Sequence, residues 1–474
     1  MKETYTHNPI IQPIYLLNSI FIMSSISRNA AFKMAKSLGR CRFQATVSAP
    51  GQYINNNINH QSLSTAAAMS MSSAPPSSST FGSSQMQVNE YQQSSHNQYS
   101  SHDASFDLLQ QSVQRVTRNA AQTATESVPQ QVWVDLGSAD GTNSLSTIQQ
   151  CLQASDHAQH QHPLNIPHKI QVTFSEHPDS DADILQRNIQ QAVVWQQYPR
   201  HSHAVHMQSF YEPVFPNNSV DLALSHICVH WLDRSNVNDL MEWKRLNNPS
   251  LSTEQLQSFT SVNDAACPPS VRQAWQQHLA IPHLSRFWQL RARELKVGGE
   301  CFVTMPAFPH QFVSPIMSNG NGDTDEQPGI LTRALQECVA RGQVDAQVLE
   351  RTIVPCYLRT VPEVVESFHQ ANRALLAEES TTTVTTPTPQ LELVNVRSDL
   401  TITGGNNTNS SGEDTIQSTA NLFWSIMAGS VRAAGLTPAE EVPLKHEIDR
   451  LFHQHFAHKG VEGHFIAATV RRVA

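Results

Sequence analysis

The sequence predicts an α/β protein built on a mainly parallel β-sheet that is covered by helices. The first support is a repeated order of elements, in which short apolar segments are each followed by a loop and then by helical sequence. These segments are Val132–Leu136, Ile170–Glu176, Ser219–Ser225 and Glu300–Met305. Strands that alternate with helices in this way are typical of parallel sheets. The second support is a glycine-bearing loop directly after the first segment, where sheets of this kind bind ligands.

The remaining elements can be placed in chain order around these strands. A helix is expected over Leu108–Ala121, before the first strand, and another over Arg291–Cys301. The second helix ends at the Gly-Gly pair within that range, because glycines allow a left-handed helix stop, and the chain then re-enters a strand. Two later apolar runs, Leu391–Arg397 and His464–Val470, flank a helical stretch near residues 415–458. We expect these runs to pair with each other, or with the sheet at an edge.

Charge and cysteine content narrow the class of protein. The chain of 474 residues has 31 Lys+Arg against 40 Asp+Glu, which gives a formal net charge of -9. A protein that tracks the phosphates of a nucleic acid would carry a basic surface, so no nucleic-acid partner is expected. The 7 cysteines include no Cys-x-x-Cys pair. An odd, unpatterned set of this kind is typical of reduced thiols inside a cell.

Residues 1–96 form a leader that we expect to be disordered. No acidic residue occurs between Glu3 and Glu90, residues 23–42 could form a basic amphipathic helix, and the sequence from 43 onward is of low complexity. A Ser-rich, basic, acid-free start is typical of a transit peptide, which would direct the chain to a mitochondrion or plastid. The alternative is an unstructured leader with no address, which would leave the protein in the cytoplasm. Residues 10–23 are apolar but too short and interrupted to span a bilayer, and no other segment could do so.

The loop after Val132 has the chemistry of a ligand site. An apolar strand ends near Asp135, and glycines follow at Gly137 and Gly141 before a helix opens near Ser144. The glycines let the backbone turn tightly and approach a ligand closely. The helix N-terminus offers N–H groups to a carboxylate. The alternative interpretation is a plain tight turn between a strand and a helix.

A nicotinamide cofactor fits this loop poorly. Gly137 and Gly141 are separated by three residues, so the Gly-x-Gly-x-x-Gly spacing is not met. The next acidic residue at a strand end, Glu176, lies 41 residues after Asp135, whereas a dinucleotide fold places it after about 20. A carboxylate at this strand end could accept hydrogen bonds from two ribose hydroxyls. The alternative for Glu176 is a solvated charge.

Four motifs occur in a fixed order between residues 132 and 305. The first is Asp135-Leu-Gly-Ser-Ala-Asp-Gly-Thr-Asn-Ser144, and the others are Ser209-Phe-Tyr with Phe215-Pro-Asn-Asn-Ser, then His230-Trp-Leu, and Pro268-Pro-Ser-Val. Together they resemble the SABATH methyltransferases, which methylate small carboxylic acids or related nitrogen heterocycles. The first motif is similar to the family pattern Asp-x-Gly-Cys-x-x-Gly-x-Asn-[Ser/Thr], with Ser138 in place of the cysteine. The resemblance is absent before residue 97 and thin after residue 310.

The resemblance implies a Rossmann-like class I methyltransferase sheet and S-adenosylmethionine as the cofactor. It places the cofactor-binding residues at Asp135, Gly137, Ser138, Asn143, Glu176, Ser209 and Phe210. Asp135 and Asn143 would help to hold the methionine portion, and Glu176 stands where the family has an aspartate on the ribose. Ser209 would hydrogen-bond the adenine, and the Phe210 ring would lie against its face and exclude water.

On the acceptor side, the resemblance implies that Trp231, His230 and Phe106 line the substrate site. The Trp231 indole is a donor only, which suits the carboxylate of a substrate, and His230 would line the same site. A strand-end aromatic cluster without a ligand is the alternative for this pair.

The chain departs from the family at the N-terminal element Tyr-x-x-x-Ser-x-x-Gln, whose glutamine also binds the substrate carboxylate. Matching this element at Tyr99 puts Phe106 at the glutamine position and Asp103 at the serine position. Matching it at Tyr91 restores both residues but lies farther from the cofactor loop. We prefer Tyr99, because helical sequence follows it directly. Plant members also tend to have a tyrosine where Ile227 stands, so salicylate-like specificity is not assumed.

The resemblance implies methyl ester formation on a small-molecule carboxylic acid. A carboxylate is already ionised, so no general base is needed and no catalytic residue is assigned. The protein has only to align acceptor, methyl group and sulfur while excluding water. One alternative is N- or O-methylation of a small heterocycle or phenol, for which His230 becomes a candidate base. Others are a non-catalytic relative that binds the cofactor, and a scaffold whose polar N-terminal tract recruits partners.

We expect the chain to divide into four parts. These are the leader at 1–96, a methyltransferase core at 97–310 with a helical insertion near 233–280, a helical cap at 311–390, and C-terminal edge strands with cap helices at 391–474. Family members often pair, so a homodimer is an expectation of the resemblance. Histidines cluster at 157–162 and 201–206, but without a regular set of three or four ligands. We expect them in solvent-facing loops and expect no metal.

Overall fold

The computed structural model describes nine stretches of the chain, which are residues 96–123, 130–161, 168–233, 240–246, 248–307, 328–379, 388–404, 412–456 and 461–474. All of them belong to the second of the two units into which the chain divides, Met1–Pro76 and Ser77–Ala474. The expected transit peptide and its basic helix lie outside the described residues.

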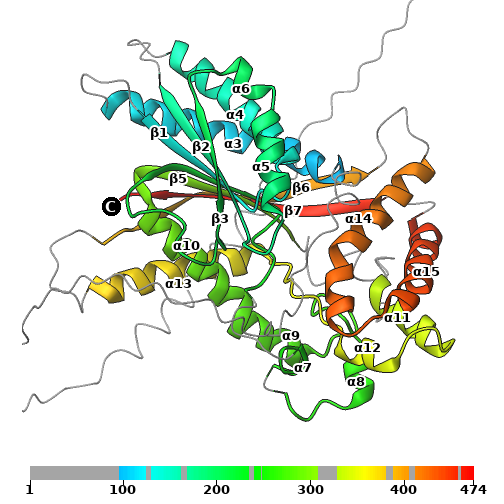
Figure 1. Ribbon diagram of the computed structural model, residues 1–474. Helices are drawn as coiled ribbons and strands as arrows, with labels where there is room; N and C mark the ends of the chain where they lie inside the picture. Colours follow the sequence, from blue (N-terminus) through cyan, green and yellow to red (C-terminus); the bar gives the residue numbers. More distant parts are fainter. Residues whose placement is uncertain are drawn as a thin grey trace, which may run out of the picture. The chain divides into compact units, whose positions relative to one another are not determined.

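A seven-stranded sheet in the order β3-β2-β1-β4-β5-β7-β6 organises the second unit (Figure 1). Its strands are β1 (Gln130–Leu136), β2 (Lys169–Glu176), β3 (Ser202–Met207), β4 (Val220–His226), β5 (Leu295–Pro306), β6 (Leu391–Gly404) and β7 (Val461–Arg472). Neighbours from β3 to β5 run parallel, while β7 lies between β5 and β6 and is antiparallel to both. The expected α/β class is thereby confirmed. The two late runs do pair with each other, and β7 also joins the sheet.

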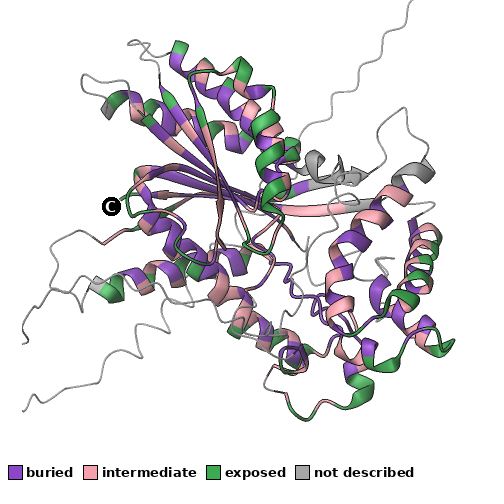
Figure 2. Ribbon diagram, viewed as in Figure 1, coloured by how far each residue is buried: buried purple, intermediate pink, exposed green. Residues whose placement is uncertain are grey.

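Helices cover both faces of the sheet. One face carries α3 (His96–Thr123), α4 (Thr142–His160), α5 (Ala182–Gln191) and the short α6 (Val194–Gln197), and the other carries α10 (Ile281–Glu294) and α13 (Val361–Glu379). Side chains alternate between these faces along each strand. In β1, Trp133 packs in the core beneath α3 and α4, while Val134 packs in the core beneath α10 and α13. Figure 2 accordingly shows buried residues along the strands and exposed residues on the outer helix faces.

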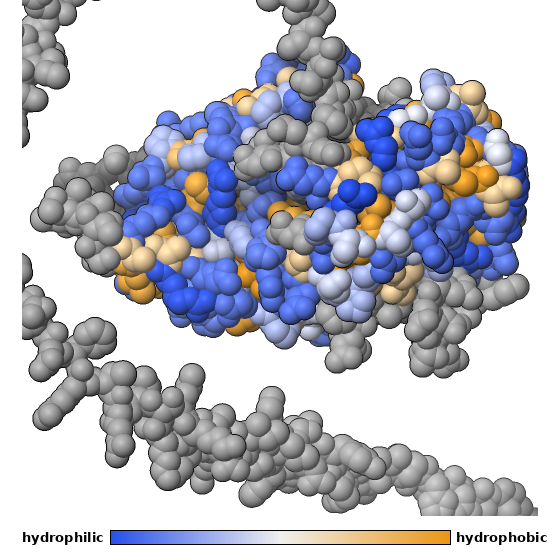
Figure 3. All heavy atoms as spheres, turned by 90° about the horizontal axis from the view of Figure 1, so that it is seen from below, coloured by the Kyte–Doolittle hydropathy of each residue, from blue (hydrophilic) through white to orange (hydrophobic). Residues whose placement is uncertain are grey.

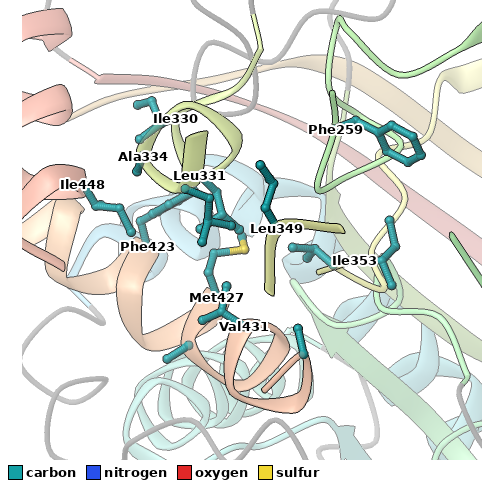
Figure 4. Close-up of a cluster of buried hydrophobic side chains, with 14 of the residues drawn as sticks. Phe259, Ile330, Leu331, Ala334, Leu349, Ile353, Phe423, Met427, Val431 and Ile448 are labelled. Atoms are coloured by element: carbon teal, nitrogen blue, oxygen red, sulfur yellow. The ribbon is translucent and has the colours of Figure 1, made fainter. Parts of the chain in front are cut away.

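A third hydrophobic core joins helices that come from three separate parts of the chain. Its helices are α7 (Leu240–Arg245), α8 (Thr253–Gln257), α9 (Pro269–Trp275), α11 (Ile330–Ala340), α12 (Ala346–Arg351), α14 (Gly412–Ala433) and α15 (Pro438–Phe456), which we call the helical cluster. Leu331, Leu349, Phe423 and Met427 are among the side chains that meet in its interior (Figure 4). A π-helix, η1 (Gln276–Ala280), connects α9 of this cluster with α10 on the sheet.

The surface seen in Figure 3 is mainly hydrophilic, with hydrophobic residues in small groups. Within the described part of the chain, none of the helices is long and apolar enough to cross a membrane. The six described cysteines are free thiols, as the sequence suggested.

Three predicted features are wrong in detail. The helix before β1 begins at His96, so Tyr99 to Phe106 lie inside α3 and do not precede it. The helix expected over Arg291–Cys301 already ends at Glu294, and the glycines lie within β5. Gly298 has φ +82° there, next to an irregular register between β4 and β5, so it bends a strand and does not stop a helix.

The third error concerns the histidine clusters, because four of their five described members do not lie in loops. His157 and His160 lie in the last turn of α4, and His203 and His206 lie in β3, a strand that the sequence did not reveal. Among the described residues, no group of three or more His, Cys, Asp or Glu side chains could hold a metal ion.

Candidate active site

Gly137 and Gly141 shape the loop between β1 and α4. Both have a left-handed backbone, with φ of +87° and +85°. A Cβ added to Gly137 would lie 2.4 Å from Sγ of Cys228 and 3.7 Å from a ring atom of Phe210. Glycine is therefore required at position 137 for the turn and for the close approach of its neighbours.

Glu176 lies beside this loop because of the register of the sheet. Leu136 of β1 pairs with Ser175 of β2, so the next residue of β2 is level with the start of the loop. The backbone N–H of Ala139 donates to Oε2 of Glu176 at 2.6 Å, and the N–H of His177 donates to Oε1 at 2.9 Å. The Ser180 hydroxyl also donates to Oε1, at 3.2 Å. Each carboxylate oxygen has two acceptor sites, so the remaining capacity lies on Oε2 and suits one hydroxyl of a ligand.

Asp135 is a buried carboxylate at the carboxyl end of β1. Its Oδ2 accepts a hydrogen bond from the Ser138 hydroxyl at 2.7 Å. Burial raises the pKa of Asp135 to about 6, against the opposing effect of hydrogen bonds from Ser144 and Ser138 and with a smaller contribution from Glu176. A cation such as an ammonium would stabilise the ionised form of this group. Asn143 lies close by in sequence, in the first turn of α4.

A buried ion pair on α10 holds the backbone of the loop that contains Ser209 and Phe210. Arg291 and Glu294 pair at 2.9 Å between Nε and Oε2. Arg291 Nη1 donates to the carbonyl of Phe210 at 3.0 Å, and the N–H of Val214 donates to Oε1 of Glu294 at 2.7 Å. Because both partners are buried, the loop is fixed by charge-assisted hydrogen bonds from the helix beneath it.

The Phe210 ring lies between the sheet and α10. It meets Phe287 edge-on, with 6.1 Å between ring centroids, and lies 4.8 Å from the ring of Tyr211. The Ser209 hydroxyl accepts from the N–H of Tyr211 at 3.3 Å. Since Phe210 also approaches Gly137, the structure brings the two predicted halves of the cofactor site together.

Beyond the carboxyl end of β4, the chain forms a turn that carries His230 and Trp231. Ile227 has φ +54°, an unusual backbone conformation for a β-branched residue. His230 is buried, and its Nδ1 has no hydrogen-bond partner among the described residues. Burial and then the charge of Arg359 lower the pKa of His230 to about 3, so the ring is neutral.

The segment between α12 and α13 fixes the backbone of this turn. The N–H of Tyr357 donates to the carbonyl of His230 at 2.9 Å, and the backbone of Trp231 forms an antiparallel β-bridge with that of Cys356. The hydroxyl of Tyr211 donates to the carbonyl of Trp231 at 2.7 Å. The predicted acceptor residues are thus held by parts of the chain that are remote in sequence.

Phe106 offers no polar group to a substrate. Its half-buried ring packs into the core beneath α3 and α4. Asp103 is exposed and accepts a hydrogen bond from Gln150 on α4 at 3.4 Å, so it does not act as a buried acid. At this position the structure offers no counterpart to the glutamine of the family pattern.

The sequence missed a pair of stacked imidazoles at the end of β4. The rings of His102 on α3 and His226 lie 4.1 Å apart, and His102 Nδ1 is 2.7 Å from the hydroxyl of Thr147. Burial lowers the pKa of His102 to about 4, and that of His226 well below its usual value. The position of His226 as the last residue of β4 could have indicated a role at the site, but no signal in the sequence pointed to His102.

The chemistry of these groups fits S-adenosylmethionine. Asp135 suits its ammonium group, Oε2 of Glu176 suits a ribose hydroxyl, and the ring of Phe210 suits the adenine. All three lie around Gly137. Asp135 is at the carboxyl end of β1, Glu176 at that of β2, and Phe210 follows the carboxyl end of β3. Ligands of open parallel sheets bind at this edge.

Comparison with known proteins points to the same cofactor. A family model described as SAM dependent carboxyl methyltransferase matches residues 83–416. Anthranilate O-methyltransferase 3 of Zea mays is 30% identical over 156 residues, which are 33% of this chain and 36% of that protein. Inactive anthranilate O-methyltransferase 1 of Zea mays is 25% identical over 256 residues, which are 51% and 62% of the two chains. The chain therefore spans less than two thirds of the length of these relatives.

Among solved structures, loganic acid methyltransferase with SAH aligns with 81% of this chain and 96% of its own, at a TM-score of 0.59 and 17% identity. This likeness shows the fold, which is that of a class I methyltransferase. The family model covers more than half of the chain. The chain belongs to the family of SAM-dependent carboxyl methyltransferases, and the resemblance to the SABATH proteins is confirmed. The cofactor of that family is S-adenosylmethionine.

Proposed function

We propose that the protein transfers the methyl group of S-adenosylmethionine to the carboxylate of a small-molecule acid, forming a methyl ester. The observation that carries this proposal is the convergence of Asp135, Glu176 and Phe210 on Gly137, beside a turn with His230. One side of this arrangement suits the cofactor, and the other suits an acceptor. The activity of the whole protein rests on relatives that match the chain only in part.

Cofactor binding would use the residues that the sequence identified. Asp135 and Asn143 would hold the methionine portion, Ser138 would orient Asp135, and Glu176 would accept from the ribose. Ser209 and Phe210 would bind the adenine in the loop held by the ion pair on α10. Gly137 would let the cofactor approach the backbone. When bound, the cofactor supplies an electrophilic methyl group.

A carboxylate suits the acceptor site better than a nucleophile that must lose a proton. At a pKa of about 3, the neutral His230 ring is a weak base at neutral pH. An ionised acid needs no base, and the residues have only to orient it and exclude water. The Trp231 indole N–H and an imidazole N–H would donate to its oxygens. This supports esterification over N- or O-methylation of a heterocycle or phenol.

A second candidate function is cofactor binding without transfer. It is favoured by Phe106, which offers no donor to a carboxylate, and by the similarity to a relative described as inactive. Under this hypothesis the cofactor residues remain useful, while the acceptor site has lost its chemistry.

The two functions are separated by two measurements on the full chain. Calorimetry with S-adenosylhomocysteine tests the cofactor site, and tritium transfer from labelled cofactor to a metabolite extract, with anthranilate as a defined acid, tests turnover. We expect binding, and label in an ester that alkali hydrolyses. Binding without label supports the second candidate, and no binding rules out both. A chain lacking residues 1–96 should still transfer label, whereas a scaffold function would be lost.

A further inference from the structure

Arg359 is a fully buried cation with an unusual set of partners. Its side chain is 0% exposed, and no ion pair joins it to a described carboxylate. Nε and Nη2 donate to the carbonyl of Ala280 at 3.1 and 2.8 Å, and Nη1 donates to the carbonyl of Val229 at 2.7 Å. A buried charge that lacks an ion-pair partner is expensive in free energy. Its retention at this place therefore requires an explanation.

A nearby acid does not neutralise Arg359 directly. Burial lowers the pKa of Arg359, and Tyr211 and Glu363 act in the opposite direction. Glu363 has donors of its own, because it accepts from the hydroxyl of Tyr357 at 2.8 Å, from Gln276 Nε2 at 2.7 Å and from the N–H of Thr360 at 2.7 Å. The positive charge of Arg359 is consequently stabilised from a distance but not paired.

The charge lies directly behind the proposed acceptor turn. Val229, whose carbonyl it binds, immediately precedes His230 and Trp231. The hydroxyl of Tyr211 approaches the same carbonyl at 3.4 Å and donates to that of Trp231 at 2.7 Å. Arg359 and Tyr211 thus hold the turn together, but only Arg359 brings a charge to it. Its field reaches the site, since it contributes to the lowered pKa of His230.

We propose that Arg359 is a positioning and specificity-determining residue, which fixes the turn from Val229 to Trp231 and favours an anionic methyl acceptor over a neutral one. This inference rests on the proposed function and deepens it. In the register that we prefer, the family glutamine position is occupied by Phe106, which has no donor. A cation behind the turn supplies an attraction for a carboxylate that does not depend on such a donor. The anion in turn offsets the free energy of burying Arg359.

The test separates the charge of Arg359 from its hydrogen bonds. Binding of anthranilate and of its neutral amide, anthranilamide, is measured by calorimetry on the full chain saturated with S-adenosylhomocysteine. The first variant is R359Q, which removes the charge but keeps an amide donor. The second is R359K, which keeps the charge but loses the planar guanidinium group that donates to both carbonyls. Y211F removes a hydrogen bond to the turn without changing charge. R341Q is the matched control, because Arg341 is 45% exposed and pairs with Glu447 in the helical cluster.

We expect the wild type and R359K to prefer the acid over the amide. R359Q should lose that preference by about tenfold, while its affinity for S-adenosylhomocysteine stays within about twofold of the wild type. Y211F should weaken acid and amide alike, and R341Q should weaken neither. A merely structural role for Arg359 would lower both affinities together and leave their ratio unchanged.

Two results would overturn the inference: a wild type without preference for the acid, or an R359Q variant that keeps it. If R359Q does not fold, E363Q decides, because removing this acid leaves Arg359 less compensated and should raise the preference about threefold or more. An unchanged or lower preference in E363Q then overturns it. Failure of the wild type to bind S-adenosylhomocysteine instead removes the proposed function itself.

Discussion

Backbone strain is concentrated at single residues around the site. Gly137, Ala139 and Ile227 all have a left-handed backbone, with φ of +87°, +51° and +54°. Outside glycine such conformations cost on the order of 1–3 kcal/mol and persist only where the surroundings enforce them. Ala139 presents its N–H to Glu176, so its strain has an identifiable use in holding the proposed ribose-binding acid.

Gly137→Ala should weaken cofactor binding strongly. The new Cβ would lie 2.4 Å from Sγ of Cys228, so the loop or the turn after β4 must shift. We expect S-adenosylhomocysteine affinity to fall by roughly a hundredfold, or about 2.7 kcal/mol. Gly435→Ala is the control, because it is strained at φ +108° but meets no atom within 4 Å. Calorimetry showing equal affinity losses in both variants would contradict the assignment.

Cofactor affinity should depend on pH through Asp135. Its raised pKa of about 6 means that the ionised form is disfavoured in the unliganded protein. The stability that this group contributes therefore declines as pH rises from about 4, the pKa of an unfolded aspartate, to about 6. A bound ammonium favours the ionised form, so affinity for the cofactor should be highest above about pH 6 and should fall about tenfold for each pH unit below it.

Calorimetry between about pH 5 and 8 measures this dependence, with adenosine as a ligand that lacks the ammonium. Asp135→Asn should bind S-adenosylhomocysteine more weakly at neutral pH and without the slope. If adenosine shows the same slope as S-adenosylhomocysteine, another group titrates.

At the residue scale, the sequence pointed to candidate site residues that lie at strand ends. Asp135 and Glu176 were identifiable because each closes an apolar segment. Arg359 was not, because nothing in Pro-Cys-Tyr-Leu-Arg indicates that the guanidinium is buried against two carbonyls of other segments. His102 was missed for the same reason, since its stack with His226 depends on how α3 packs against β4.

Among the elements, α10 positions the proposed adenine loop. Arg291 and Glu294 lie three residues apart, so both face the same side of the helix and reach the loop together. Phe287, one turn earlier, supports the ring of Phe210. The helix therefore determines the position of the loop that we propose to bind the adenine.

Arg291→Met alone should destabilise the protein by about 3–5 kcal/mol, because Glu294 would remain buried and unpaired. The double variant R291M/E294Q should recover much of that stability yet still bind S-adenosylhomocysteine at least about tenfold more weakly, since the loop loses its anchors. Urea unfolding and calorimetry provide the two readouts. Arg293→Met is the control, as Arg293 pairs with Glu378 at the surface and should change stability by less than about 1 kcal/mol. Full affinity in the double variant would show that the ion pair is only structural.

Strand β3 could not be predicted from its sequence pattern. Ser202–Met207 contains two histidines, and its side chains are mostly half-buried, so it lacks the apolar run that marked β1, β2, β4 and β5. As an edge strand it pairs with β2 alone. Edge position explains the weak signal, because only one neighbour demands complementary side chains.

The described part of the molecule combines a sheet whose strands, except β3, were predictable from local patterns with a helical cluster whose packing was not. Each helix of the cluster was foreseeable as helical sequence, but its partners come from segments before and after β6. Long-range packing of this kind leaves no periodic trace in the sequence. The motifs that resemble the family lie between residues 132 and 305, so they indicated the sheet and the cofactor loop. The expected limits of the resemblance, at residues 97 and 310, are too narrow, because the family model matches residues 83–416.

Lys244 tests the stability of the helical cluster. It is buried, donates to the carbonyl of Leu349 at 3.1 Å, and burial lowers its pKa to about 7. An unfolded lysine has a pKa of about 10.4, so the unfolded chain binds the extra proton between about pH 7 and 10. Stability attributable to this group therefore rises with pH across that window and is lowest at and below pH 7.

Lys244→Met should accordingly stabilise the protein near neutral pH, and the gain should shrink toward about pH 10. Urea unfolding at several pH values measures this difference. Lys169→Met, at an exposed position in β2, should show no such dependence. A gain that is equal at all pH values would mean that packing, and not charge, is responsible.

The position of β7 has a consequence for how the protein is made. This strand is the last in chain order, yet it lies between β5 and β6. A ribosome therefore synthesises the other six described strands before β7, which pairs with both β5 and β6, has emerged. Until then β5 and β6 carry unsatisfied edges that can capture foreign strands. Nascent chains should depend on holding chaperones until translation passes β7, and termination before β7 should yield aggregates.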